Sequence, residues 1–280
     1  MDAAAFLGME PAKRPLCWRL EVTASLSTGG GFLFGGCGLA AAIVALEAAT
    51  GRNLVWATAQ YLSYARPPAV LTVEVTPVVE GRSVTQARAV GRVGEVEVFT
   101  VNAALGHRSF EADGSWAERP EVAPPAQAPA RQLADRHDNT IMSRVEMRLA
   151  DARQMDEFDG SPGSGRSAVW ARVPGLSTSA AGLGVLGDWV PFGIGQALGG
   201  RVGGNSLDNT LRVVRLVPTD WVLLDIRIQG VANGFGHGLV HLWAEDGTLL
   251  ATASQSAIMR AWSEARPAPL APARSSVPAP

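Results

Sequence analysis

A run that is apolar on every side covers residues 35–50, with the sequence GGCGLAAAIVALEAAT, and its first charged residue is Glu47. A helix at a protein surface shows a polar stripe, so this run predicts a helix that is buried all round. It is too short for the ~20 apolar residues of a bilayer-spanning helix. Gly51 stands where a left-handed C-cap glycine belongs. We therefore expect a core helix about which the rest of the domain is wrapped.

Runs of partly alternating apolar and polar residues lie on both sides of this helix and predict strands. One precedes the helix and the others follow it, at residues 16–26, 55–64, 70–79, 83–91 and 95–104. The turns between the later runs are tight, which favours antiparallel pairing, because parallel strands need a long crossover. The first half thus predicts a strand, a buried helix and a meander of strands.

The second half repeats this order of elements. A short strand (169–173) and a small-residue loop (177–182) precede a weaker, glycine-containing helix (186–198), and strands are expected at 207–217, 221–229, 236–244 and 248–259. When the halves are laid on each other, Gly36 falls on Asp188, and the shared order indicates an internal duplication. Two such units bury more surface if their sheets join edge to edge. The predicted fold class is α+β, with two tandem units that each wrap an antiparallel sheet about a helix.

The remaining segments have compositions unsuited to a core. Residues 1–15 are expected to be a disordered lead-in, residues 107–139 a mobile Pro/Ala-rich linker and residues 263–280 a disordered tail. This leaves an N-terminal unit at 16–106 and a C-terminal unit at 140–262.

Composition narrows the class of protein. The chain has 280 residues, is 47% hydrophobic and 18% charged, and carries a net charge of −2, as expected for a globular protein with a substantial core. No Lys/Arg face recurs, so a nucleic-acid partner is not expected. The first residues lack the pattern of a secretory signal, and membrane insertion is not expected either. The two cysteines, Cys17 and Cys37, do not form a disulfide framework or a zinc site, and we interpret them as reduced thiols in a cytoplasmic protein.

Three polar residues are candidates for chemistry. Asp188 stands at the start of the second predicted helix among apolar neighbours; Asp is a favoured N-cap, but desolvation there would also raise its basicity. Gln255 interrupts small residues near the end of the last strand, where a buried amide would need a hydrogen-bond partner such as a water or a carbonyl. Ser206 lies before the second meander, where loop capping is the common role.

Several other motifs are weaker evidence of function. The G-x-G-x-x-G match at 182–187 is not followed by a dinucleotide-binding pattern and is a chance match. His237 and His241 share a face of a predicted strand, but no third ligand is near and no metal is expected. No G-x-S-x-G nucleophile motif occurs, and Cys37 within an apolar helix is expected to be inert.

Four segments together resemble the acyl-CoA thioesterase II (TesB-like) family, whose fold is a double hotdog. Each matches a family motif in order and spacing: Phe34-Gly35-Gly36 at the helix start, residues 61–68 (YLSYARPP), Asp188 with residues 206–210 (SLDNT), and Gln255 with Ile258-Met259-Arg260. The resemblance covers about residues 20–106 and 140–262. Ser206 stands where the family has a Thr, and two further departures matter more: Cys37 replaces a Gln and Asn209 replaces a His.

The resemblance implies hydrolysis of a fatty acyl-CoA without a covalent intermediate. Asp188, Ser206 and Gln255 would hold the water, with Asp188 as the base. Gly35, Gly36 and Gly187 are the predicted substrate-binding residues, since backbone N–H groups at a glycine-rich helix start can stabilise the oxyanion of the reaction. The family implies no cofactor and a homodimer or higher homo-oligomer.

Two alternatives stay open. The departures at Cys37 and Asn209 suggest an acyl-CoA binder that has lost turnover. An enoyl-CoA hydratase ranks last, because no His follows Asp188.

Overall fold

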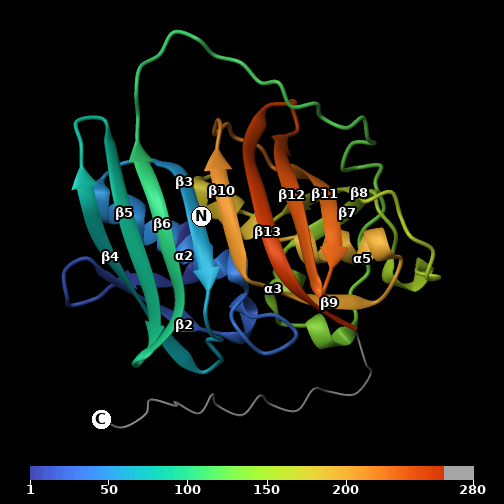
Figure 1. Cartoon of the computed structure of the whole chain (residues 1–280), viewed down its shortest axis with the longest axis horizontal. Helices are drawn as coiled ribbons and strands as arrows, with labels where there is room; N and C mark the ends of the chain where they lie inside the picture. The colour runs from blue at the N-terminus through green and yellow to red at the C-terminus, as the bar shows by residue number, and fades with distance from the viewer. Residues whose placement is uncertain (262–280) are drawn as a thin grey trace.

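A 13-stranded antiparallel sheet joins the two halves of the chain in the computed structural model, which describes residues 1–261 (Figure 1). The order along the sheet is β1-β2-β4-β5-β6-β3-β10-β13-β12-β11-β8-β7, and β9 pairs with β13. The halves meet where β3 pairs with β10, and the hydroxyls of Thr58 and Thr210 lie 3.0 Å apart across this junction. The prediction that the two sheets join edge to edge is confirmed.

The elements have the following bounds. The helices are α1 (Ala3–Leu7), α2 (Gly35–Thr50), α3 (Ile141–Arg144), α4 (Ala180–Leu186) and α5 (Val190–Leu198), with 3-10 turns η1 (Ala24–Leu26), η2 (Asp135–His137) and η3 (Met155–Glu157). The strands of the first half are β1 (Met9–Pro11), β2 (Cys17–Val22), β3 (Leu54–Tyr61), β4 (Ala69–Glu80), β5 (Val84–Val93) and β6 (Val96–Gly106). Those of the second half are β7 (Glu146–Asp151), β8 (Arg166–Arg172), β9 (Val202–Ser206), β10 (Asp208–Val213), β11 (Val222–Ala232), β12 (Phe235–Ala244) and β13 (Leu249–Ala261).

Helix α2 is largely buried from Gly36 to Leu46, as its apolar composition predicted, while its last turn, which begins at Glu47, is partly exposed. It ends at Gly51, whose φ of 64° is left-handed. It packs against the strands of the first half and against α4. The two helices approach closely near Gly36, where a Cβ would lie 2.9 Å from the carbonyl oxygen of Gly184. The small residues of both helices therefore permit the contact that brings the two halves together in the core. The double hotdog fold is confirmed.

The second core helix is broken, unlike the prediction of one helix over residues 186–198. Helix α4 begins after Ser179, whose side chain caps it, and it takes in part of the predicted loop. Helix α5 follows after a break at residues 187–189. Pro191 explains the break, because a proline ring clashes with the carbonyl four residues earlier, here that of Gly187. The break turns the polypeptide at Asp188.

The prediction of a disordered lead-in over residues 1–15 is wrong. Asp2 caps α1 by accepting a 2.8 Å hydrogen bond from the Ala5 N–H, and Gly8 ends the helix in a left-handed conformation. Phe6 is buried in the core, and β1 pairs with β2. The segment is ordered because even this short helix places large apolar side chains in the core. The predicted tail at 263–280 lies outside the described residues.

The segment predicted as a mobile linker, residues 107–139, has a first part that leaves the sheet and a second part that packs against the second half of the chain. After β6 it arches away from the sheet, and it then returns along the second half (Figure 1). On its return it covers Trp170, whose indole N–H donates to the carbonyl oxygen of Ala123 at 2.8 Å. The Arg131 N–H donates to the Met147 carbonyl oxygen at 2.9 Å, along the edge of β7. Its last part is thus held against the second half, because the apolar residues on the outer face of that sheet need a cover.

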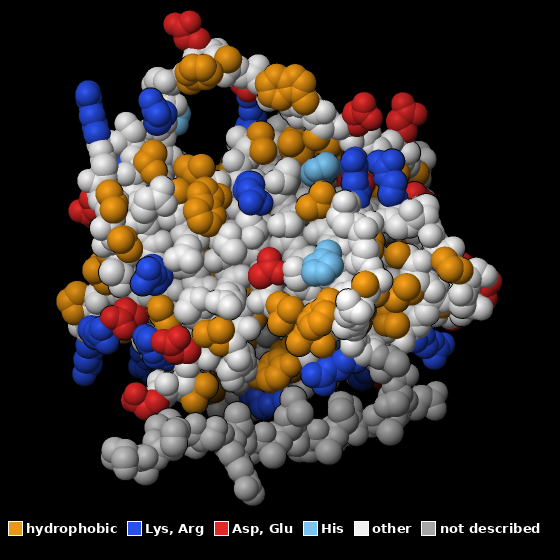
Figure 2. Space-filling model, in the orientation of Figure 1, with side chains coloured by type: hydrophobic (Ala, Val, Ile, Leu, Met, Phe, Trp, Pro, Cys, Tyr) orange, Lys and Arg blue, Asp and Glu red, His pale blue; other side chains and the backbone are white. Residues whose placement is uncertain are grey.

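The outer face of the sheet is largely neutral in the view of Figure 2, where Lys and Arg side chains form separate groups. A protein that binds nucleic acid through such a face carries a continuous basic stripe. This face carries none.

Candidate active site

The break between α4 and α5 places Asp188 in the core, with 5% of its surface exposed. Its carboxylate does not cap α5, whose N-cap is Trp189, so the capping interpretation is wrong. Instead Oδ2 accepts a 2.6 Å hydrogen bond from the Gly36 N–H, at the start of α2. The positive end of a helix thus stabilises the ionised form of this buried acid.

The other carboxylate oxygen meets the two remaining candidates. Ser206 donates its hydroxyl to Oδ1 at 3.2 Å, and the amide Nε2 of Gln255 also donates to Oδ1. The Ser206 hydroxyl and the Gln255 amide nitrogen are themselves 3.1 Å apart. The carbonyl of Gln255 accepts from the Val190 N–H at 3.0 Å, which orients the amide. The three predicted residues therefore form one hydrogen-bonded group.

The sheet explains how residues so distant in sequence meet. Ser206 ends β9, which pairs with β13 and places Ser206 opposite Ala257, close to Gln255. Asp208 secures this strand, since its carboxylate accepts a 2.7 Å hydrogen bond from the Ser256 N–H. Asp208, the first residue of β10, thus has a structural role between β10 and β13.

Burial raises the pKa of Asp188 from its ordinary 3.8 to about 6. The hydrogen bonds from Gln255, Gly36 and Ser206 act in the opposite direction, because they stabilise the carboxylate, but desolvation is larger. A carboxylate with this pKa is ionised at neutral pH and is a stronger base than an exposed one. General bases are most effective when their pKa lies near the working pH.

The three glycines predicted to bind substrate differ in what their amides can do. The Gly36 N–H is engaged by Asp188, and the Gly187 N–H donates to the Leu183 carbonyl oxygen at 2.8 Å. For these two N–H groups the predicted oxyanion contact is wrong, because each already has a protein acceptor. Gly35 lies against the carboxylate, and a Cβ there would be 2.7 Å from Oδ2 of Asp188.

Tyr61 is a neighbour of this group that the sequence did not single out as a site residue. It ends β3, and its hydroxyl donates to the Gly35 carbonyl oxygen at 2.7 Å. Burial and then the charge of Asp188 raise its pKa well above the ordinary value, so the phenol stays neutral. Its position at the start of the aromatic segment shared with the family was the available signal.

The remaining candidates, Cys37, His237 and His241, lie in surroundings that do not support a catalytic role. Cys37 is fully buried, and burial and then the charge of Asp188 raise the pKa of its thiol. His237 contacts the Ser256 hydroxyl at 3.0 Å, and His241 lies 3.6 Å from the Asp225 carboxylate. Among residues 1–261, no three His, Cys, Asp or Glu side chains are placed to hold a metal ion.

Family models match both halves of the chain. The acyl-CoA thioesterase N-terminal domain matches residues 22–106, and the acyl-CoA thioesterase C-terminal domain matches residues 120–259. The chain therefore belongs to the acyl-CoA thioesterase family with a double hotdog fold. The C-terminal match begins within the predicted linker, in agreement with the packing of that segment on the second half.

Solved structures share the architecture. A candidate thioesterase from Novosphingobium aromaticivorans is 32% identical, with a TM-score of 0.78 over 88% of this chain and 96% of its own. A hot dog protein from Alicyclobacillus acidocaldarius is 22% identical, with a TM-score of 0.81 over 93% and 98%. The acyl-CoA thioesterase II TesB2 of Mycobacterium marinum is 19% identical, with a TM-score of 0.73 over 93% and 99%. No curated protein matches by sequence.

No helix in the described part of the chain is long and apolar enough to span a membrane.

Proposed function

We propose that the protein hydrolyses the thioester of a fatty acyl-CoA with a water that Asp188, Ser206 and Gln255 hold. The observation that supports this most directly is the convergence of a hydroxyl and an amide on one buried carboxylate whose pKa is about 6. Such a carboxylate accepts a proton at neutral pH, and the two donors can orient the water that supplies it. General base assistance of this kind contributes factors of roughly 10²–10⁴.

The proposed reaction has two steps. Asp188 takes a proton from the water as its oxygen adds to the thioester carbonyl, which gives a tetrahedral oxyanion and a protonated Asp188. The intermediate then collapses, the carbon–sulfur bond breaks, and the CoA thiolate takes the proton from Asp188. Free acid and CoA leave, and the carboxylate is restored.

The oxyanion of the intermediate needs a hydrogen-bond donor to stabilise its charge. With the N–H groups of Gly36 and Gly187 engaged, Gly35 at the first turn of α2 is the glycine we assign to it. A helix N-terminus supplies both an N–H group and a favourable dipole for such a charge. The aromatic rings of Phe34 and Trp189, whose centroids are 5.9 Å apart, provide an apolar wall beside the site for an acyl chain.

Release of free CoA from acyl-CoAs of graded chain length tests the proposal. The wild type is expected to release CoA from at least one chain length, and Asp188→Asn to lose a factor of roughly 10²–10⁴ in kcat. Asp246→Asn is the matched control, because Asp246 lies in an exposed turn and accepts from the Thr248 N–H, which an Asn also allows. No release from any chain length, or full activity in Asp188→Asn, would overturn the proposal.

The same assay decides the alternatives. An acyl-CoA binder without turnover would bind these compounds and release no CoA, whereas a hydratase would consume crotonyl-CoA without releasing CoA. The complete Asp188 group favours hydrolysis. A cytoplasmic homodimer or higher homo-oligomer belongs to the same proposal, and light scattering measures the oligomeric state.

A further inference from the structure

Arg131 is a cation without an acidic partner close to the candidate active site. Its guanidinium lies over the rings of Trp189, at 5.4 Å from the centroid, and of Phe192, at 5.2 Å. Its side chain donates a hydrogen bond to the sulfur of Met147, at 3.2 Å, and no carboxylate within the described residues forms an ion pair with it. Burial lowers its pKa to about 10. A desolvated charge without a partner is costly, and an anionic ligand would offset that cost.

Other basic side chains lie in the same region. The pKa of His137 is lowered by burial and then by the charges of Arg136 and Arg131, and that of Arg136 by burial and then by the charge of Arg201. Like charges thus face one another along η2 and the segment that leads into β9, which ends at Ser206. Asp135 and Asp138 of the same turn are exposed. The charges of Arg136 and Arg201 therefore lie in the same region as Arg131, together with those of the exposed acids Asp135 and Asp138.

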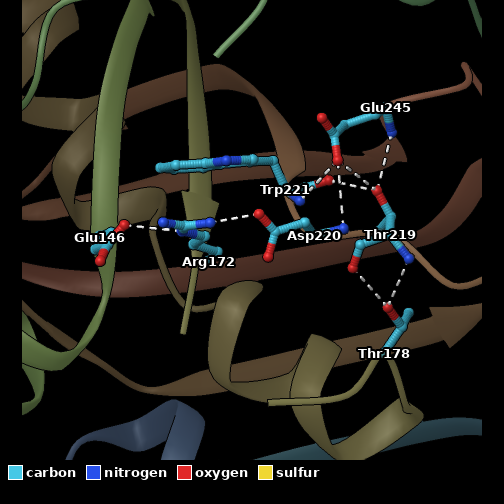
Figure 3. A network of polar contacts seen from close by, with 7 residues as sticks. All are labelled: Glu146, Arg172, Thr178, Thr219, Asp220, Trp221 and Glu245. Carbon is cyan, nitrogen blue, oxygen red and sulfur yellow. Dashed lines mark hydrogen bonds and ion pairs between the residues drawn. The ribbon is translucent and has the colours of Figure 1, made fainter. Parts of the chain in front are cut away.

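Arg131 also lines a cavity of about 400 Å³. The cavity lies beside β7, and its other polar lining residues are Ser143, Glu146 and Arg148. The Arg148 guanidinium lies 5.7 Å from the ring centroid of Trp221 and donates to a backbone carbonyl. The one acid in this lining, Glu146, accepts a 2.8 Å hydrogen bond from Arg172, which also forms an ion pair with Asp220 (Figure 3). The cavity thus presents two arginines to whatever occupies it.

We propose that this cavity is an anion subsite in which Arg131 and Arg148 bind phosphate groups of the CoA moiety. The proposal rests on the proposed function for the identity of the anion. Arg131 connects the subsite to the reaction centre, because it covers the ring of Trp189, the residue after Asp188. Arginine suits the role, since its planar donors match phosphate oxygens. The subsite would select CoA thioesters over thioesters that lack the nucleotide.

Calorimetric titration with CoA and with pantetheine tests the subsite without any turnover. The wild type is expected to bind CoA more tightly than pantetheine. Arg131→Gln and Arg148→Gln, tested separately, are each expected to weaken CoA binding about tenfold or more, as for a charge-assisted hydrogen bond, and to leave pantetheine binding unchanged. Arg212→Gln removes the same charge from an exposed position on β10 and is the control. Thermal melts establish that each variant is folded.

Two results of the titration would overturn the proposal. One is CoA binding no tighter than pantetheine in the wild type. The other is equal CoA affinity in Arg131→Gln, Arg148→Gln and Arg212→Gln. If Arg131→Gln does not fold, Arg148→Gln decides alone.

A kinetic comparison separates the subsite from the proposed function. Octanoyl-CoA and the octanoyl thioester of N-acetylcysteamine carry the same reacting group, but only the first has phosphates. The two variants are expected to raise KM for octanoyl-CoA and to leave the KM of the second substrate unchanged. Equal changes for both substrates would indicate a structural role and would overturn the subsite. If the protein hydrolyses neither of these substrates nor any other acyl-CoA, the thioesterase proposal is overturned. The CoA titration still decides the subsite in that case.

Discussion

The N–H of Gly36 donates a 2.6 Å hydrogen bond to Asp188, a residue 152 positions later in the chain. These two residues occupy equivalent positions when the halves are superposed by sequence order. The candidate site is therefore built where the two copies meet, and the copies have diverged in role. One supplies a backbone donor at a helix start and the other supplies the carboxylate, so neither half contains the site alone.

The raised pKa of Asp188 predicts the pH dependence of turnover. Only the carboxylate can accept a proton, so kcat should be low where Asp188 is protonated and should rise to a plateau as the pH passes through about 6. We expect a single ionisation with its midpoint near that value when kcat is measured between about pH 4 and 9. A midpoint near 4, the value of an exposed carboxyl, would show that Asp188 is not the base.

Gly35 is predicted to be required because its surroundings leave no room for a side chain. The conformational freedom of a glycine backbone is not the reason. In Gly35→Ala the new methyl would lie 2.7 Å from the Asp188 carboxylate and 3.1 Å from the Tyr61 hydroxyl, so one of them must move. We expect kcat to fall by about tenfold or more, since small displacements of catalytic groups are costly. Gly38→Ala is the control, because its methyl would meet the Phe99 ring at 3.4 Å and the Leu33 side chain at 3.8 Å, which are ordinary contact distances. Equal activities of the two variants would contradict the prediction.

The fold could be predicted from the sequence where patterns are long. The uniformly apolar residues 35–50 have no stable position except inside the protein, and they form α2. Short elements were missed because their stability comes from tertiary contacts. Helix α1 depends on burying Phe6, and β9 is a strand of mostly small residues (VGGNS) that is recognisable only through its pairing with β13.

The site could be predicted only in part, for a related reason. Asp188, Ser206 and Gln255 were found through the resemblance to a family, since each has an ordinary structural role when considered alone. Which backbone N–H groups are free depends on the break before α5 and on hydrogen bonds between the halves. Sequence spacing contains no information on those contacts, and so the roles expected of Gly36 and Gly187 were wrong.

Ser206 is predicted to act through its hydroxyl, which contacts both Asp188 and Gln255. Ser206→Ala removes two hydrogen bonds from the group that would orient the water, and we expect kcat to fall about tenfold with a smaller change in KM. Ser256→Ala is the matched control on the neighbouring strand, where the hydroxyl contacts His237 instead. The kinetic constants of both variants with the best acyl-CoA substrate provide the measurement. A rise in KM with kcat unchanged would instead assign Ser206 to substrate binding.

Cys37 is predicted to take no part in the reaction, although it lies at the start of α2, near Asp188. Its side chain is fully buried, and desolvation together with the charge of Asp188 raises the pKa of the thiol, which keeps it protonated and unreactive. We expect the native protein to resist alkylation at Cys37 by iodoacetamide, and we expect the reagent to modify the residue after unfolding in urea. Cys37→Ala should keep kcat within about twofold of the wild type, because the deleted sulfur is small and the helix favours alanine. Rapid alkylation of folded protein with parallel loss of activity would instead identify a thiolate at the centre, and hydrolysis would then proceed through a covalent acyl-enzyme, with Asp188 and Gln255 serving that nucleophile rather than a water.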